Sequence, residues 1–107
     1  MTANIIELEL TPVLARKYLR EIATDSGKVF FSDHVLKRMA QRKITTVQVM
    51  RCLKVGEIDE GPTRSIDKGN WEMLVSVISA GDILKVALAL DTDSNGNYII
   101  VITAYYA

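Results

Sequence analysis

Apolar residues in the first half of the chain recur every three or four positions, which is the spacing of one face of an α-helix. Leu14, Tyr18 or Leu19, and Ile22 follow this spacing behind a Thr-Pro pair. Threonine caps a helix start, and proline is favoured at the first helical position. The pattern therefore predicts a first helix over about 12–23.

Two further helices are expected before the middle of the chain. Ser32 suits the cap of a helix over about 33–43, and Thr45 or Thr46 suits the cap of a third over 47–55. The spacing within the third helix points four apolar side chains toward the core: Val47, Met50, Leu53 and Val55.

After residue 56 the pattern becomes that of strands, rich in Val, Ile, Leu and aromatic residues. The expected strands cover four segments: 57–60, 71–79, 83–90 and 98–106. A turn at Gly61-Pro62 is expected to end the first of them. Helices followed by an antiparallel meander predict an α+β fold, with N-terminal helices packed on a C-terminal antiparallel sheet of about four strands. We expect one domain over residues 1–107.

The segments 83–90 and 98–106 are apolar on both faces, whereas a half-exposed antiparallel strand alternates apolar and polar residues. Either a partner, a second copy or terminal residues cover the second face, or these are central strands flanked by chain. In the first case the protein is a non-catalytic module that binds a protein partner through its apolar sheet surface. A homodimer, in which a second copy covers this surface, is a further alternative.

Charge is unevenly distributed along the chain. Lys and Arg number 13 and Asp and Glu number 13, yet residues 1–56 carry a net +5 and residues 57–107 a net −5. Between His34 and Lys54 six side chains are basic and none is acidic: Lys37, Arg38, Arg42, Lys43, Arg51 and Lys54. This asymmetry favours an anionic partner, unless the acidic half neutralises the basic one within the molecule.

Composition excludes several classes of protein. One cysteine cannot form an internal disulfide, and one His with one Cys is too few for a zinc cluster. No apolar run reaches 18 residues, and the first residues are acidic rather than basic and then apolar. We therefore expect a soluble cytoplasmic protein without a membrane segment, metal or cofactor.

The most informative stretch is the second expected helix. His34, Arg38 and Arg42 recur at i, i+4 and i+8, so they form one stripe along it. The opposite side is apolar: Val35, Leu36, Met39 and Ala40. The single imidazole of the chain thus shares a stripe with two guanidinium groups.

This combination suits cleavage of RNA by its own 2′-hydroxyl. An imidazole can move a proton near neutral pH, and arginine offers paired donors to phosphate oxygens. We expect His34 to act as general base or acid, and Arg38 and Arg42 to hold the scissile phosphate. Tyr105 would donate a proton or stack on a base, and the product would be a 2′,3′-cyclic phosphate.

Other residues leave alternatives open. Lys43 and Arg51 would extend a phosphate track, or be ordinary solvated charges. The stripe of His34, Arg38 and Arg42 could equally be a solvated face, with Arg38 paired to an acid such as Glu57 or Asp59. Cys52 fits a buried, inert thiol better than a nucleophile.

The residues also resemble a known family. His34, Arg38-Met39 and Arg42, then a helix ending in Gly56-Glu57-Ile58, then Ile102-Thr103-Ala104-Tyr105, look like a toxin-like bacterial family catalogued as a domain of unknown function. Lys43 stands where that family commonly has glycine. The resemblance covers about residues 31–106.

The resemblance implies a small helices-then-sheet fold similar to RelE-type, barnase, EndoU and colicin ribonucleases. Such proteins act on RNA without a metal, often as toxins held by a cognate antitoxin. By position, His34 and Arg38 match the family's characteristic pair, Arg42 its second arginine, and Thr103 and Tyr105 its final strand. We expect RNA and an antitoxin-type protein as partners, and Thr103 among the substrate-binding residues.

Overall fold

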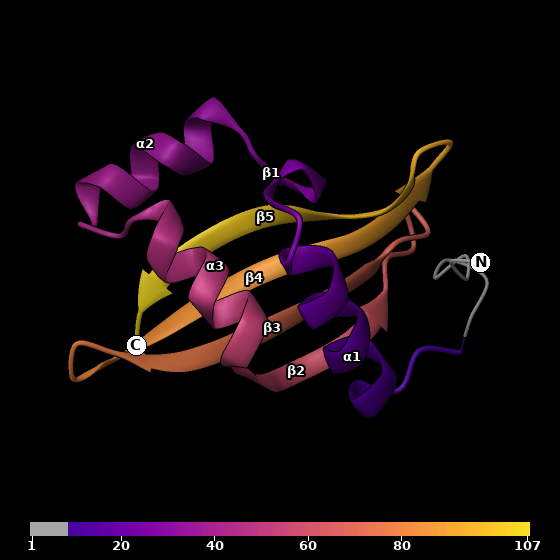
Figure 1. Cartoon of the computed structure of the whole chain (residues 1–107), viewed down its shortest axis with the longest axis horizontal. Helices are drawn as coiled ribbons and strands as arrows, with labels where there is room; N and C mark the ends of the chain where they lie inside the picture. Colours follow the sequence, from indigo (N-terminus) through magenta and orange to yellow (C-terminus); the bar gives the residue numbers. More distant parts are fainter. Residues whose placement is uncertain (1–8) are drawn as a thin grey trace.

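Three α-helices lie on one face of a five-stranded sheet in the computed structural model, which describes residues 9–107 (Figure 1). The helices are α1 (Pro12–Ala23), α2 (Asp33–Gln41) and α3 (Thr46–Val55), with a short 3₁₀ turn, η1 (Ser26–Lys28). The strands are β1 (Val29–Phe31), β2 (Glu57–Arg64), β3 (Trp71–Ser79), β4 (Asp82–Asp93) and β5 (Gly96–Tyr106). No described helix is long and apolar enough to cross a bilayer.

Each helix begins at a side chain that caps it. The Thr11 and Ser32 hydroxyls accept hydrogen bonds from backbone N–H groups three residues on. Thr45 and Gln48 form a reciprocal capping box at the start of α3. The first helix has the predicted bounds, whereas α2 ends at Gln41 because Lys43 adopts a left-handed backbone with φ 57°.

The sheet has the order β1-β5-β4-β3-β2, in which β2 to β5 form an antiparallel meander. The α+β prediction is confirmed, with five strands rather than four. The additional strand, β1, pairs in parallel with β5 at residues 99–101. Three residues are too few to give a periodic signal, so the sequence alone did not indicate it.

The prediction that a turn at Gly61-Pro62 ends this strand is wrong. Both residues lie within β2 and are joined by a cis peptide bond. The strand is at the sheet edge and pairs irregularly with β3 on both sides of Glu60, which tolerates a proline without an N–H. Gly61 has φ 86°, and a Cβ there would lie 2.7 Å from the Glu72 carbonyl oxygen. A glycine is therefore required at this position.

The core lies between the helices and the inner face of the sheet. The side chains of β4 that face the helices are fully buried: Leu84, Val86, Leu88 and Leu90. The predicted inner face of α3 is wrong in part, because Val47 and Val55 are 76% and 51% exposed. Val49 is buried instead, together with Leu53 and Cys52, which were both predicted to be buried. Along α2, Val35 and Met39 are buried, whereas Leu36 and Ala40 are exposed.

The outer face of the sheet carries no helix within residues 9–107 (Figure 1). A β-bulge in β5 shapes this face, because Ala87 pairs with Thr103 and Leu88 pairs with Val101. Ile102 is the extra residue of the bulge. Val101 and Ala104 are buried, and Ile102 and Thr103 between them line the outer face.

Candidate functional site

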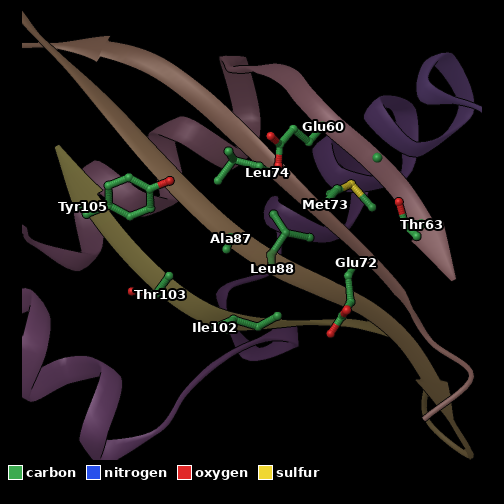
Figure 2. Close-up of a pocket in the computed structure, with 11 residues that line it drawn as sticks. Glu60, Thr63, Glu72, Met73, Leu74, Ala87, Leu88, Ile102, Thr103 and Tyr105 are labelled. Carbon is green, nitrogen blue, oxygen red and sulfur yellow. The ribbon is translucent and has the colours of Figure 1, made fainter. Parts of the chain in front are cut away.

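A hollow of about 520 Å³ opens on the outer face of the sheet (Figure 2). One cross-strand row passes through it, from Glu60 on β2 through Leu74 and Ala87 to Thr103 on β5. The small Ala87 side chain leaves space in the middle of this row. We call this space the outer-face hollow.

The two sides of the outer-face hollow differ in chemistry. Glu60, Thr63 and Glu72 stand on the β2–β3 side, and Thr103 and Tyr105 stand on the β5 side (Figure 2). Among the described residues, neither of the two glutamates forms an ion pair. The β2–β3 side therefore repels phosphate, whereas the β5 side offers hydroxyl groups and an aromatic ring.

Arg42 connects α2 to the β5 side of this hollow. Its Nη1 donates to the Ala104 carbonyl oxygen at 2.9 Å and to Thr103 Oγ1 at 3.2 Å. Because β1 pairs only with residues 99–101 of β5, the rest of that edge has no neighbouring strand within residues 9–107. Arg42 covers part of this edge. Its Nη1 is therefore occupied by hydrogen bonds to the Ala104 carbonyl and the Thr103 hydroxyl.

His34 and Arg38 lie on the exposed side of α2 and do not line the outer-face hollow. Within residues 9–107 neither side chain has a hydrogen bond or an ion pair. Helical geometry places Arg38 about 6 Å and His34 about 12 Å from Arg42 along the helix axis. His34 and Arg38 thus lie on the exposed side of α2, and Arg42, the residue after the helix, reaches the strand that borders the hollow. We call these three residues the α2 stripe.

The alternative pairing of Arg38 with Glu57 or Asp59 does not form. The Glu57 carboxylate binds Arg16 at 2.8 Å, and the Asp59 carboxylate binds Lys85 at 3.2 Å. Asp59 also accepts a hydrogen bond from the Ser76 hydroxyl at 3.0 Å. Both predicted acceptors therefore hold basic residues other than Arg38.

Tyr105 and Tyr106 point to opposite faces of β5. Tyr105 lines the outer-face hollow, close to Thr103 (Figure 2). Tyr106 packs against the core on the helix side, where its hydroxyl accepts a hydrogen bond from Gln48 Nε2 at 3.0 Å. Only Tyr105 is therefore presented to the face that the Arg42 side chain reaches.

The two remaining basic candidates belong to different elements. Lys43 is exposed directly after α2, next to Arg42. Arg51 is on α3, where its Nη1 donates to the Ile78 carbonyl oxygen at 2.9 Å. Since β2 begins opposite Ser76, residues 77–79 of β3 also have an edge that no described strand pairs with, and Arg51 covers it. Arg51 is thus not joined to the α2 stripe.

Cys52 is fully buried, as expected for an inert thiol. Burial raises the pKa of this thiol to about 12, with a further contribution from the negative charge of Asp59 and an opposing one from Arg51. Such a thiol is protonated and unreactive at neutral pH. No group of three or more His, Cys, Asp or Glu side chains within residues 9–107 could hold a metal ion.

Sequence reasoning missed the acidic side of the hollow. Glu72 alternates with the buried Trp71 and Met73, so strand periodicity was sufficient to place it on the outer face. For Glu60 the sequence offers no such signal, because the Gly61-Pro62 pair that follows it is typical of a turn that ends a strand. The sequence also does not show that the two carboxylates face Thr103 and Tyr105 across one hollow.

Comparison with protein-family models gives one match over most of the chain. Residues 31–106 match the model of the Domain of unknown function (DUF4258), which spans α2, α3 and all of β2 to β5. Both the α2 stripe and the outer-face hollow lie within the matched segment. No curated protein and no solved structure matches the chain.

Proposed function

The chain belongs to the DUF4258 family, a domain of unknown function, and we propose that it is a metal-independent endoribonuclease. The observation that carries this proposal is the α2 stripe. His34 and Arg38 are exposed and unpaired within the described residues, and Arg42 joins the same stripe to the rim of the outer-face hollow. We further propose that the protein is the toxin of a toxin–antitoxin pair.

His34 and Arg38 are one helical turn apart and can reach the same phosphate. His34 takes the proton from the ribose 2′-hydroxyl, whose oxygen attacks the adjacent phosphorus. The bond from phosphorus to the 5′-oxygen of the next nucleotide breaks, and that oxygen takes a proton from water. The protonated His34 then returns its proton to the solvent. The products are a 2′,3′-cyclic phosphate and a free 5′-hydroxyl.

Arginine supports this step through charge. The Arg38 guanidinium donates to two phosphate oxygens and stabilises the negative charge that increases on them in the transition state. Arg42 retains Nε and Nη2 for a neighbouring phosphate, because the hydrogen bonds to Thr103 and Ala104 use Nη1. Lys43 extends the same track.

The outer-face hollow would receive a base rather than the RNA backbone. Glu60 and Glu72 repel phosphate, whereas the ring of Tyr105 offers a surface for stacking. The backbone would follow the α2 stripe, and a base would turn over the edge of β5 toward Tyr105. The distance of His34 from this end of the stripe favours stacking over proton donation as the role of Tyr105.

The test compares RNA cleavage in EDTA by the wild-type protein and by His34→Ala and Arg38→Ala. We expect each variant to lose at least about 100-fold in rate, the scale of one acid–base or charge-stabilising group. Lys37→Ala is the matched control, since Lys37 is exposed on α2 outside the stripe, and it should retain activity. Equal cleavage by all four proteins would overturn the proposal.

The toxin assignment has a separate test in cells. Induced expression of the chain alone should arrest bacterial growth, and His34→Ala should relieve the arrest. If growth continues although the purified protein cleaves RNA, the toxin assignment is wrong and the ribonuclease assignment still stands.

A further inference from the structure

A second surface lies between α3 and the end of the β3–β4 hairpin. Two adjoining hollows, of about 350 and 510 Å³, share Arg51 and Val55. Together they form one groove, which we call the α3–hairpin groove. Its apolar lining consists of Val47, Met50, Val55, Val77, Ile78 and Ile83.

The apolar lining of this groove is in contact with water. Val47 is 76% exposed, Ile78 69%, Val55 51% and Ile83 48%. These are four of the nine large exposed hydrophobic residues in the described part of the chain. Single exposed hydrophobics are ordinary, but a contiguous apolar group rimmed by polar residues marks an interaction surface.

The rim of the α3–hairpin groove is basic. Arg51 and Lys54 line it, and α3 carries no acidic residue. Arg20 of α1 adds a third positive charge, because its Nε donates to the Lys54 carbonyl oxygen at 3.1 Å. Glu57, the one acid among the described residues that line the groove, is already paired with Arg16.

From this combination we infer that the α3–hairpin groove binds an acidic, amphipathic helix of a protein partner. Apolar side chains at i, i+3, i+4 and i+7 of that helix would occupy the groove. Carboxylates beside them would meet Arg51, Lys54 and Arg20. The inference does not depend on RNA cleavage.

Two other occupants fit the groove less well. A nucleic acid would be attracted by the basic rim, but its phosphates gain nothing from the isoleucine and valine lining. In a twofold dimer through this groove, the same patch would face itself, so the basic rims of two copies would repel each other. An acidic partner satisfies both the apolar lining and the charge.

The experiment selects ligands instead of assuming one. Helical peptides of about 20 residues, with apolar positions fixed and polar positions randomised among Glu, Lys, Gln and Ser, are displayed and selected on the full chain. We expect enrichment of Glu over Lys. We also expect binding to fall by about tenfold or more in Ile78→Asp and in Lys54→Glu.

The matched control is Ile66→Asp, because Ile66 is fully exposed outside the groove, and this variant should bind like the wild type. Val55→Asp repeats the groove test at a second position, and circular dichroism verifies that each variant is folded. Enrichment without acidic bias, or equal binding by Ile78→Asp, would overturn the inference. A concentration-dependent dimer that Ile78→Asp dissociates would assign the groove to a second copy and also overturn it.

Discussion

Arginines with the same sequence signal have two different structural roles in this molecule. Arg38 lies in the middle of α2, exposed and without a partner among the described residues. Arg42 and Arg51 instead donate to the carbonyl oxygens of Ala104 and Ile78. In the sequence all three belong to one acid-free basic segment, and only the structure separates them.

The difference follows from where strands extend beyond their neighbours. β5 continues past β1, and β3 continues past the first residue of β2, so both have backbone groups that pair with no strand in the described part of the chain. A guanidinium from the nearest helix covers one carbonyl at each place, which also hinders pairing with another chain. The main role of an arginine near such a strand edge is therefore structural. An arginine away from such an edge remains available to a ligand.

The largest expected effect separates Arg38 from Arg51 by activity. Arg38→Ala should lower RNA cleavage by at least about 100-fold, because it removes the donor to the scissile phosphate. Arg51→Ala should change the rate by less than about threefold, since it lies outside the α2 stripe. Initial rates on one RNA substrate measure both. Equal losses in the two variants would remove the distinction.

The second effect separates Arg42 from Arg38 by stability. Arg42→Ala should lower the free energy of unfolding by about 1–2 kcal/mol, because the Ala104 carbonyl and Thr103 hydroxyl lose a charged donor. Arg38→Ala should stay within about 0.5 kcal/mol of the wild type. Urea unfolding followed by circular dichroism gives both values. The prediction fails if Arg38→Ala is the more destabilised of the two.

Next in size is a pH effect at Cys52, the buried neighbour of the exposed Arg51. The folded pKa of about 12 is above the ordinary value of 9.0, so the unfolded chain ionises first as pH rises. Well below pH 9 the thiol is protonated in both the folded and the unfolded chain, so it adds no pH dependence to the free energy of unfolding. Between pH 9 and 12 the ionised thiol favours the unfolded chain, and the free energy of unfolding falls progressively. The wild type should lose about 1 kcal/mol between pH 9 and 10 relative to Cys52→Ala. A constant difference between the two proteins over this range would contradict the burial argument.

The smallest effect concerns Lys43, which ends α2 in the left-handed conformation beside Arg42. Lys43→Gly should raise the free energy of unfolding by about 0.5–1 kcal/mol, because glycine adopts a positive φ without strain. Lys43→Ala, which keeps the Cβ, is the control and should show no gain. Thermal unfolding of the three proteins is the measurement. No gain for glycine would mean that its larger entropy in the unfolded chain offsets the relieved strain.

Sequence patterns predicted those features of the fold that depend on residues close together in the chain. Capping residues gave the start of each helix, and periodicity placed His34 and Arg38 on the exposed side of α2, whereas Arg42 follows the last residue of that helix. The inner face of α3 was misplaced because the choice between Val47 and Val49 depends on how that helix lies on the sheet. The outer-face hollow was not predictable either, since it requires strand register and the bulge at Ile102.

The central claim is that His34 and Arg38 form the surface that meets RNA. It is tested most directly by titrating the isotope-labelled protein with a 2′-O-methyl oligoribonucleotide, which binds but cannot attack its own phosphate. We predict that the His34 ring and Arg38 Nε–H signals shift together in a saturable, salt-sensitive way, while the Arg51 signal stays in place. Shifts at Arg51 without shifts at His34 and Arg38, or none at any of them, would contradict the account.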